Sequence, residues 1–420
     1  MRAPPPPSSL LLSLLVLANC GGPRRAGAID AGVPDGNGSS TEPDVRDVSA
    51  AEPETLLPGS DAEPDNNQET QAPLDAPLDE AAEVAEIPRR YRAVALAAGG
   101  VHNCALMEDR RIFCWGNNGF AQLGQGDIKD RAGAHAVNLG AGVKAKAIAA
   151  ARYATCAIVE DGGVLCWGYR AQLGRRGGLA GGSGAPTDPD ARLDLGPGRT
   201  ARLIGMGYRE ACAVLDDESV ACWGDAYPTA RITSGPLATK VASLTAFGTG
   251  VAGLSVDGKL VHLGSKRGFV QPDDGDRFVT VGGSQFKLCV ASAKGRLACG
   301  EPQAMAYEST LPYQTLPTAL SVADFGPVCA LEGTVVWCHN VSGMQRWWAV
   351  PGVSPLGTTV AVNLDAPAAS LSNGGGNQAC ALLQDGAVKC WGDLSIASLY
   401  GTNTPTPGQP WPPIDFGPRP

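Results

Sequence analysis

The cysteines of this 420-residue chain constrain its fold more than any other feature. Twelve of the 13 form pairs whose members lie nine or ten residues apart. The pairs are Cys104 with Cys114, Cys156 with Cys166, Cys212 with Cys222, Cys289 with Cys299, Cys329 with Cys338, and Cys380 with Cys390. A further copy of the pattern lacks cysteine and has Ala252 and His262 at the paired positions. The chain therefore contains seven units, and the 276 residues from Cys104 to Cys380 divide into six intervals that average 46 residues, a period typical of propeller blades.

Each unit has the pattern of a β-hairpin. In residues 156–166, apolar residues alternate on both sides of Asp161-Gly162, which is a short turn signal. Glycine occupies the same turn position in four units, where a left-handed backbone suits it: Gly162, Gly258, Gly295 and Gly386. Arg110 and Glu218 take this position in units one and three, so we expect those two turns to differ or to be strained.

The hairpin geometry favours disulfides between the paired cysteines. Residues ten apart face each other across the two strands, at a distance that a disulfide can bridge. Zinc sites favour cysteines two to four residues apart, and the chain has no such pair. Free thiols and a metal site are the alternatives. Disulfides form readily in an exported chain, because the compartments outside the cytosol are oxidising. Closing each loop with a disulfide adds up to roughly 3 kcal/mol of stability.

Residues 1–20 are typical of an export signal. A positive charge precedes the apolar stretch Leu10–Ala18, which is too short to cross a bilayer. Leu17-Ala-Asn-Cys20 resembles a bacterial lipobox, so we predict that Cys20 is lipidated and becomes the mature N-terminus. Gly21 then indicates sorting to the outer membrane, on the periplasmic or the cell-surface side. Asn19 departs from the usual small residue, and cleavage after Ala28, giving a soluble secreted protein, is the alternative.

Residues 21–90 are predicted to be a disordered, acidic, proline-rich tether. This segment has no aromatic residue, and residues 26–88 hold 16 Asp or Glu against one Arg, Arg46. Such a composition cannot bury enough apolar surface to fold. The body is nearly neutral, with 29 Lys or Arg against 26 acidic residues over 89–420. We therefore expect no nucleic-acid partner.

The body resembles a known repeat family. Cys114-Trp-Gly, followed by Gln122-Leu-Gly, recurs as Cys166-Trp-Gly with Gln172-Leu-Gly. These strings are similar to repeats of the regulator of chromosome condensation (RCC1) family, in its exported, cysteine-bearing bacterial branch. The resemblance implies an all-β, seven-bladed β-propeller over residues 91–416, with four-stranded blades. Residues 413–416 resemble the outer strands of other units. We expect this last strand to join blade one and close the ring.

The sequence favours binding over catalysis. Its four histidines fall at unrelated positions in different units, and no convergent set of acids, bases or nucleophiles is visible. We therefore expect no enzyme, no cofactor and no metal. Aromatic and basic residues in the loops of the repeats are the candidate binding residues, because Tyr, Trp and Arg commonly anchor interfaces. They are His102, Tyr153, Tyr208, Arg209, Phe286, Lys287, Trp347 and Trp348, and packing under neighbouring loops is the alternative role.

The expected function is that of a monomeric, non-enzymatic binding or scaffold propeller. It would be attached to the membrane through its lipid anchor and would recognise a protein or a glycan. The alternative is an inhibitor of an exported enzyme, because a secreted β-lactamase inhibitor of this family is also a seven-bladed propeller. A guanine-nucleotide exchange activity, which the nuclear founder of the family implies, is less favoured because small GTPases are cytosolic.

Overall fold

The computed structural model describes the repeat region with several gaps. The described residues are 91–169, 173, 185–188, 191–225, 227–234, 237, 240–248, 250–263, 275–300, 306–310, 315–324, 327–339, 359–372, 378–392 and 412–417. Every regular element among them is a β-strand, and the 25 strands form seven antiparallel sheets. The predicted signal peptide, Cys20 and the tether lie outside the described residues.

Each sheet is one blade, and the blades follow one another along the chain. Blade one comprises β1 (Ala93–Ala98), β2 (His102–Met107), β3 (Ile112–Gly116) and β4 (Arg131–Ala136). Blade two comprises β5 (Ala145–Ala150), β6 (Ala154–Val159) and β7 (Val164–Gly168). Blade three comprises β8 (Ala201–Met206), β9 (Glu210–Leu215), β10 (Val220–Gly224) and β11 (Tyr227–Ser234). Blade four comprises β12 (Val241–Phe247), β13 (Gly250–Ser255) and β14 (Leu260–Leu263).

The remaining three blades have the same order of strands. Blade five comprises β15 (Phe278–Gly283), β16 (Leu288–Ser292), β17 (Arg296–Gly300) and β18 (Ala306–Thr310). Blade six comprises β19 (Ala319–Val322), β20 (Val328–Glu332), β21 (Val335–His339) and β22 (Thr359–Ala361). Blade seven comprises β23 (Ala368–Leu371), β24 (Gln378–Leu383) and β25 (Val388–Gly392). The expected seven-bladed architecture is thus confirmed.

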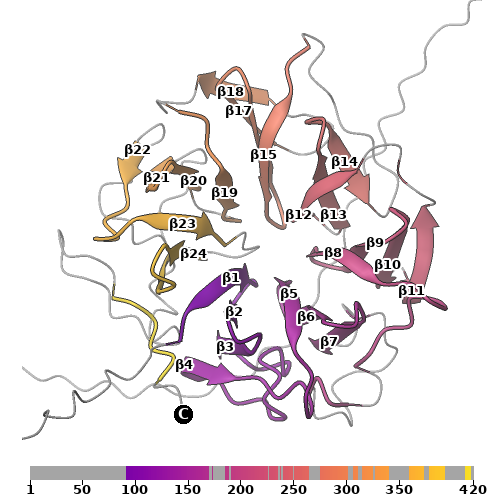
Figure 1. The fold of residues 1–420 in the computed structure, drawn as a ribbon. Coiled ribbons are helices and arrows are strands. Elements are labelled where there is room, and N and C mark those ends of the chain that lie inside the picture. Colours follow the sequence, from indigo (N-terminus) through magenta and orange to yellow (C-terminus); the bar gives the residue numbers. More distant parts are fainter. Residues whose placement is uncertain are drawn as a thin grey trace, which may run out of the picture. The chain divides into compact units, whose positions relative to one another are not determined.

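The blades are arranged in a ring with their first strands innermost (Figure 1). The first strands contact one another in the order β1, β5, β8, β12, β15, β19 and β23, and β1 also contacts β24. The second strands of blades one, two, three, four and seven are buried at every residue, because each lies between two neighbouring blades. The apolar core is therefore divided into clusters, most of which join two consecutive blades.

All six predicted cysteine pairs are disulfide-bonded. Each disulfide joins the second and third strands of one blade, where the two cysteines are directly opposed and their Cα atoms lie 4.0–4.2 Å apart. The sulfurs are buried within the clusters between blades. In blade four, Ala252 and His262 are opposed in the same register, which confirms this blade as the cysteine-free copy. In chain order, the bonds join Cys104 and Cys114, Cys156 and Cys166, Cys212 and Cys222, Cys289 and Cys299, Cys329 and Cys338, and Cys380 and Cys390.

The hairpin turns adopt the left-handed conformation that the sequence predicts. Gly162, Gly258, Gly295 and Gly386 have φ values between 73° and 85°. Arg110 and Glu218 adopt φ values of 72° and 61° at the same position. These two turns therefore have the same left-handed conformation as the glycine turns, and this conformation is strained for a residue with a Cβ atom.

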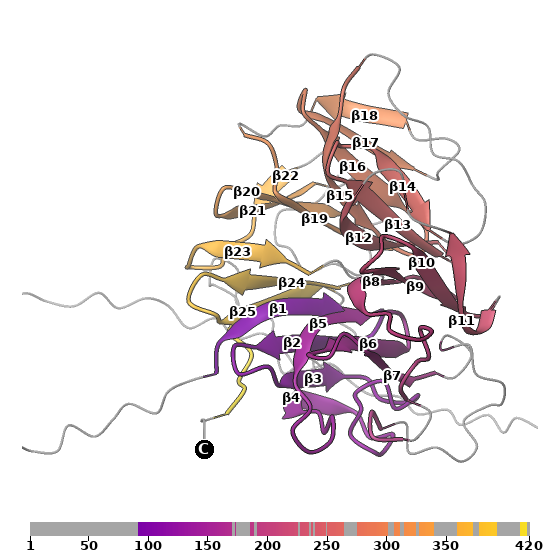
Figure 2. The ribbon, with the colours of Figure 1, turned by 45° about the vertical axis from the view of Figure 1, so that its right-hand side comes forward.

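The structure corrects the prediction that residues 413–416 join blade one. The backbone N–H of Ile414 donates to the carbonyl of Val388 in β25, in the way that Val137 donates to Ile112 within blade one. Residues 412–417 thus form no regular strand, and the hydrogen bond of Ile414 goes to blade seven and not to blade one. The side chains of Ile414 and Phe416 nevertheless pack against blade one, and β24 lies beside β1 (Figure 2).

Candidate functional site

The strand register places two kinds of loop on one face of the ring. They are the turn before each second strand and the loop after each third strand. In blade one, His102 at the start of β2 is opposite Gly116 at the end of β3. Blades two and three have the same pairing. The turn before each second strand and the loop after each third strand therefore emerge together, and we call this surface the loop face. The short hairpin turns lie on the opposite face.

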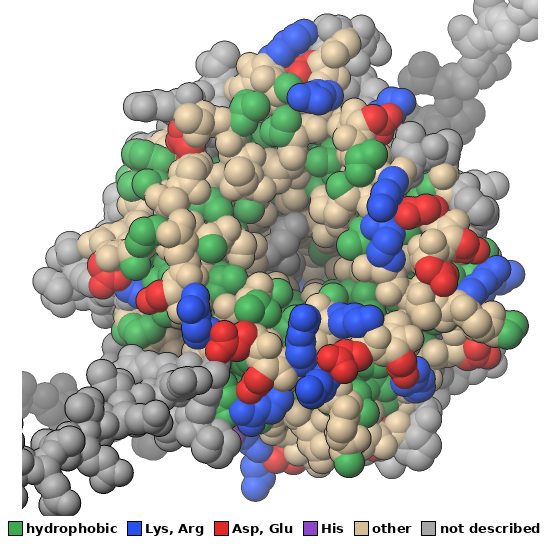
Figure 3. Space-filling model, in the orientation of Figure 1, with side chains coloured by type: hydrophobic (Ala, Val, Ile, Leu, Met, Phe, Trp, Pro, Cys, Tyr) green, Lys and Arg blue, Asp and Glu red, His purple; other side chains and the backbone are tan. Residues whose placement is uncertain are grey.

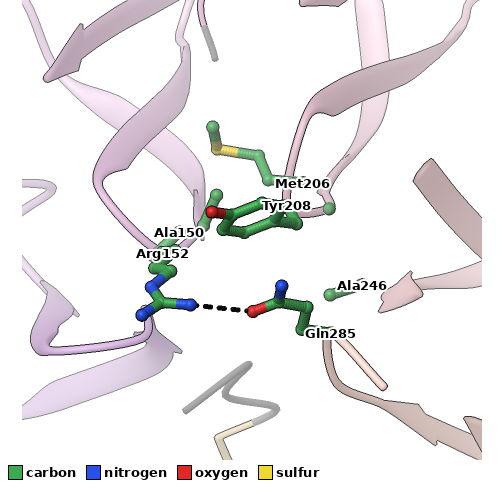
Figure 4. A pocket seen from close by; sticks show the side chains of 8 residues that line it. Ala150, Arg152, Met206, Tyr208, Ala246 and Gln285 are labelled. Atoms are coloured by element: carbon green, nitrogen blue, oxygen red, sulfur yellow. Dashed lines mark hydrogen bonds between the residues drawn. The ribbon is translucent and has the colours of Figure 1, made fainter. Parts of the chain in front are cut away.

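Arg152 lies at the centre of the loop face, at the inner end of blade two. Its Nη1 donates a hydrogen bond of 3.0 Å to Oε1 of Gln285, which belongs to blade five. This bond joins blades two and five and lies beside Met206 and Tyr208 of blade three and Ala246 of blade four (Figure 4). The centre of the ring is also hollowed in the space-filling view (Figure 3). Arg152 and Gln285 thus close part of the central channel at its loop-face end.

Two tyrosine rings hold the guanidinium of Arg152 in place. Its Nε donates to the Tyr153 hydroxyl at 2.8 Å. The guanidinium carbon lies 5.1 Å from the ring centroid of Tyr153 and 5.5 Å from that of Tyr208, within the range of cation–π attraction. The three side chains are half-buried. They fix the guanidinium beside Gln285.

A small pocket lies beneath the bond between Arg152 and Gln285. Its walls are mostly small side chains at the inner ends of blades two, three and four. The lining residues are Ala150, Ala151, Arg152, Met206, Gly207, Tyr208, Ala246 and Gln285. At Gly207, a Cβ atom would come within 1.9 Å of the Gly250 carbonyl oxygen, so only glycine permits this approach of blades three and four.

Asp324 positions Gln285 from below. Its Oδ1 accepts the backbone N–H of Gln285 at 2.8 Å. Burial raises the pKa of Asp324, although the N–H of Gln285, the side chain of Ser284 and the charges of Arg152 and Lys287 oppose this rise. The carboxyl group is therefore buried beneath the pocket and is already engaged by the turn that carries Gln285.

An aromatic patch extends from Arg152 toward blade one. The ring centroids of Tyr153 and Phe120 lie 4.5 Å apart, and those of Phe120 and Tyr169 lie 5.0 Å apart. Tyr208 contacts the guanidinium as well, and all four rings are half-buried. We call Phe120, Tyr153, Tyr169 and Tyr208 the aromatic patch.

The structure brings only some of the predicted binding residues together. Tyr153 and Tyr208 both contact Arg152. Arg209 is exposed and lies 3.5 Å from Asp225, and Phe286 is 46% exposed. Lys287 lies near Asp324. Trp347 and Trp348 lie outside the described residues.

His102 is buried and links blades one and two. Its Nε2 lies 2.8 Å from the Thr155 hydroxyl, which itself donates to the Gln122 carbonyl at 2.8 Å. Because Thr155 uses its proton on Gln122, His102 must donate through Nε2 and is neutral. Burial lowers the pKa of His102 to about 3. The Gln122 carbonyl also accepts Trp167 Nε1 at 3.0 Å, so His102 is placed to support the blade interface and offers no exposed surface to a partner.

Sequence reasoning missed Arg152, Gln285 and Asp324. Arg152 and Gln285 occupy the same position, four residues before the leading cysteine of their units. The recurrence of a long polar side chain at this position could have indicated a functional site. Asp324 lies five residues before Cys329 and carried no such signal.

The described residues contain neither a metal-binding cluster nor a bilayer-spanning helix. No group of three or more His, Cys, Asp or Glu side chains there is arranged to hold a metal ion. That same part of the chain also contains no helix long and apolar enough to span a bilayer.

Comparison with known proteins identifies one repeat type. Residues 93–122 match the family model of the regulator of chromosome condensation (RCC1) repeat. The ultraviolet-B receptor UVR8 of Arabidopsis thaliana is 29% identical over 136 residues, which are 32% of this chain and 29% of the receptor. The mitochondrial RCC1 domain-containing protein RUG3 of the same plant is 28% identical over 149 residues, 33% of this chain and 32% of that protein. The matched region thus spans about a third of each relative.

Two solved structures resemble the fold. Yeast RCC1 (Prp20), solved with Kap60, has a TM-score of 0.43 at 18% identity, covering 73% of this chain and 71% of that one. The CRINKLY WD40 ectodomain of the Arabidopsis thaliana receptor kinase ACR4 has a TM-score of 0.48 at 16% identity, covering 72% of this chain and 96% of that one.

Proposed function

Because this chain carries an RCC1-type repeat within a seven-bladed propeller, we propose that it is a non-enzymatic binding protein that recognises another protein through its loop face. The observation that carries the proposal is the aromatic patch around Arg152. Tyr and Arg side chains that are held rigidly lose little conformational entropy on binding and often dominate interface energies. The exposed Phe286 lies on the same face and extends the surface available to a partner.

The charge distribution supports a protein partner over nucleic acid. The body is nearly neutral, with 29 Lys or Arg against 26 acidic residues over 89–420. On the one face that Figure 3 shows, Lys and Arg side chains lie among Asp and Glu side chains. Nucleic-acid binding generally needs a continuous basic surface. An aromatic surface with a single central guanidinium resembles the core of a protein interface instead.

We further propose that the mature protein is an outer-membrane lipoprotein tethered through Cys20. The support is the Leu17-Ala-Asn-Cys20 sequence and the six disulfides, which suit an oxidising compartment. The test is the intact mass of protein isolated from its native membrane fraction. A mature chain that begins at lipidated Cys20 is expected. A soluble chain that begins at Ile29 would show that no anchor is present.

Capture experiments with the full mature chain test the binding function. The immobilised protein is exposed to the exported and membrane fractions of its own source, and the wild type is compared with Tyr208→Ala and Phe286→Ala. Val256→Ala is the matched control, because Val256 is 64% exposed in a hairpin turn on the opposite face. We expect a captured protein to be lost with the two loop-face variants and retained with the control. Equal capture by all four proteins would refute binding through the loop face.

The same experiment separates a scaffold from an inhibitor. A captured enzyme whose activity falls on binding would show inhibition, whereas a captured partner with unchanged activity would show a scaffold. An array of glycans probed with the same variants covers the other class of ligand, and loop-face-dependent binding there would redirect the proposal from proteins to glycans.

A further inference from the structure

The hydrogen bonds of Arg152 go to neutral groups. Its two hydrogen-bond acceptors are the Tyr153 hydroxyl and the Gln285 amide oxygen. Among the described residues, none of the ion pairs involves Arg152. A guanidinium has five N–H donors in a planar fork, so this side chain retains capacity to bind a charged acceptor.

Asp324 does not fill this role. Its carboxylate accepts the Gln285 backbone N–H and lies beneath the turn, where it forms no ion pair with Arg152. Lys287 contributes a second positive charge to the same neighbourhood. Both positive charges act on Asp324, whose carboxyl group is buried.

The pocket suits a small anionic group. Alanine and glycine are half of its lining residues, and the tyrosine rings shield the guanidinium from bulk water. In such an environment a charged hydrogen bond is stronger than in water, and a carboxylate binds a guanidinium better than an amide does. Gln285 offers an amide oxygen at 3.0 Å, which is a weaker substitute for a carboxylate oxygen in the same place.

We propose that Arg152 binds a carboxylate of the partner protein, which displaces Gln285 as the acceptor at the mouth of the central channel. This inference rests on the proposed binding function and names the chemistry of its central contact. Gln285 holds the guanidinium in position while the site is empty. The carboxylate belongs to an Asp or Glu side chain or to a chain terminus, since both present the same two oxygens.

Nuclear magnetic resonance of the arginine Nε–H groups tests the site without the partner. The probes are N-acetylglutamate amide, with a side-chain carboxylate, N-acetylglutamine, with a terminal carboxylate, and N-acetylglutamine amide, which is neutral. We expect a saturable shift of the Arg152 signal with at least one carboxylate probe and none with the neutral probe. Equal shifts with all three probes would overturn the proposal. The more effective carboxylate probe identifies the source.

Three variants sharpen the test. Gln285→Glu places a carboxylate beside Arg152 within the chain and should weaken the probe by about tenfold or more, while Gln285→Ala removes the competing acceptor and should strengthen it. Arg209→Lys is the matched control, because Arg209 lies on the same face and is near Asp225. Thermal unfolding verifies that each variant is folded. Probe affinity that is the same in Gln285→Glu as in the wild type would also overturn the proposal.

Partner capture distinguishes this inference from the function on which it rests. If a partner is captured equally by the wild type and Gln285→Glu, binding through the loop face stands and the carboxylate contact is wrong. If the carboxylate probe binds as expected but no partner is captured, the site stands and the proposed function fails. Loss of both the partner and the probe in Gln285→Glu supports the two together.

Discussion

The backbone N–H of Ile414 donates to the carbonyl of Val388 at 2.8 Å, at the outer edge of blade seven. Two residues later, the Phe416 ring meets the edges of Phe113 and Trp115 in blade one, with centroids 5.8 Å and 5.9 Å apart. The C-terminal segment thus belongs to one blade through its backbone and to the next through its side chains. No strand is exchanged between the first and last blades in the described structure, so these side chains contribute directly to ring closure.

Replacing Phe416 by Ala should therefore weaken the junction of blades seven and one. Truncation of a largely buried phenylalanine leaves a cavity, and we expect the free energy of unfolding to fall by about 3 kcal/mol. Urea unfolding monitored by tryptophan fluorescence measures the change, with Val256→Ala as an exposed control. Deletion of residues 409–420 should lower stability further and unfold the body cooperatively. A deletion variant with an unchanged unfolding curve would show that the segment has no part in closure.

A disulfide introduced into blade four should stabilise the protein. Ala252 and His262 are opposed in the same register as Cys212 and Cys222 in blade three. The double variant Ala252→Cys/His262→Cys should form a seventh disulfide and gain up to about 3 kcal/mol, less the contacts that His262 loses. Alkylation of thiols before and after reduction counts the disulfides, and urea unfolding measures stability. The control is Ala252→Ser/His262→Ser, and a seventh disulfide with no gain over this control would contradict the prediction.

The blades were predictable because their signals are local. A spacing of ten residues around a turn defines a hairpin wherever it occurs, and its recurrence revealed the cysteine-free blade through Ala252 and His262. Residues 413–416 were predicted to form an outer strand on blade one, whereas they form no regular strand and Ile414 bonds to blade seven. Alternating apolar residues such as Ile414 and Phe416 predict a strand, but they do not identify the strand to which its backbone bonds.

The candidate site was only partly predictable because it depends on ring closure. Arg152 and Gln285 lie 133 residues apart and meet only because blades two and five face each other across the channel. His102 shows the opposite error. Its place at the edge of a unit suggested an exposed position, but β2 is buried along its whole length between two blades. Alternation of polar and apolar residues therefore does not reveal which face of such a strand is accessible.

The strained hairpin turn of blade one should be improved by glycine. Arg110 has a φ of 72°, its side chain is exposed, and its backbone carbonyl accepts the N–H of Ala145, a bond that Arg110→Gly retains. Relief of the left-handed strain exceeds the entropy cost of glycine, so we expect a gain of roughly 0.5–1 kcal/mol. Glu218→Gly relieves the same strain but removes the 2.6 Å ion pair with Arg202, and should be nearly neutral. Thermal unfolding compares the two variants, and a larger gain for Glu218→Gly would refute this account.

The buried imidazole of His102 should make the protein sensitive to mild acid. Its folded pKa of about 3 lies below the ordinary value of 6.5, so between these values the unfolded chain binds a proton that the folded chain excludes. Stability is therefore complete above pH 6.5 and falls with decreasing pH by up to about 1.4 kcal/mol per unit. His102→Gln keeps a donor for Thr155 but cannot titrate. We expect the advantage of the wild type over His102→Gln to shrink by roughly 2 kcal/mol between pH 6.5 and pH 5, measured by urea unfolding. Parallel pH profiles for the two proteins would show that His102 is protonated in the folded state or is not buried.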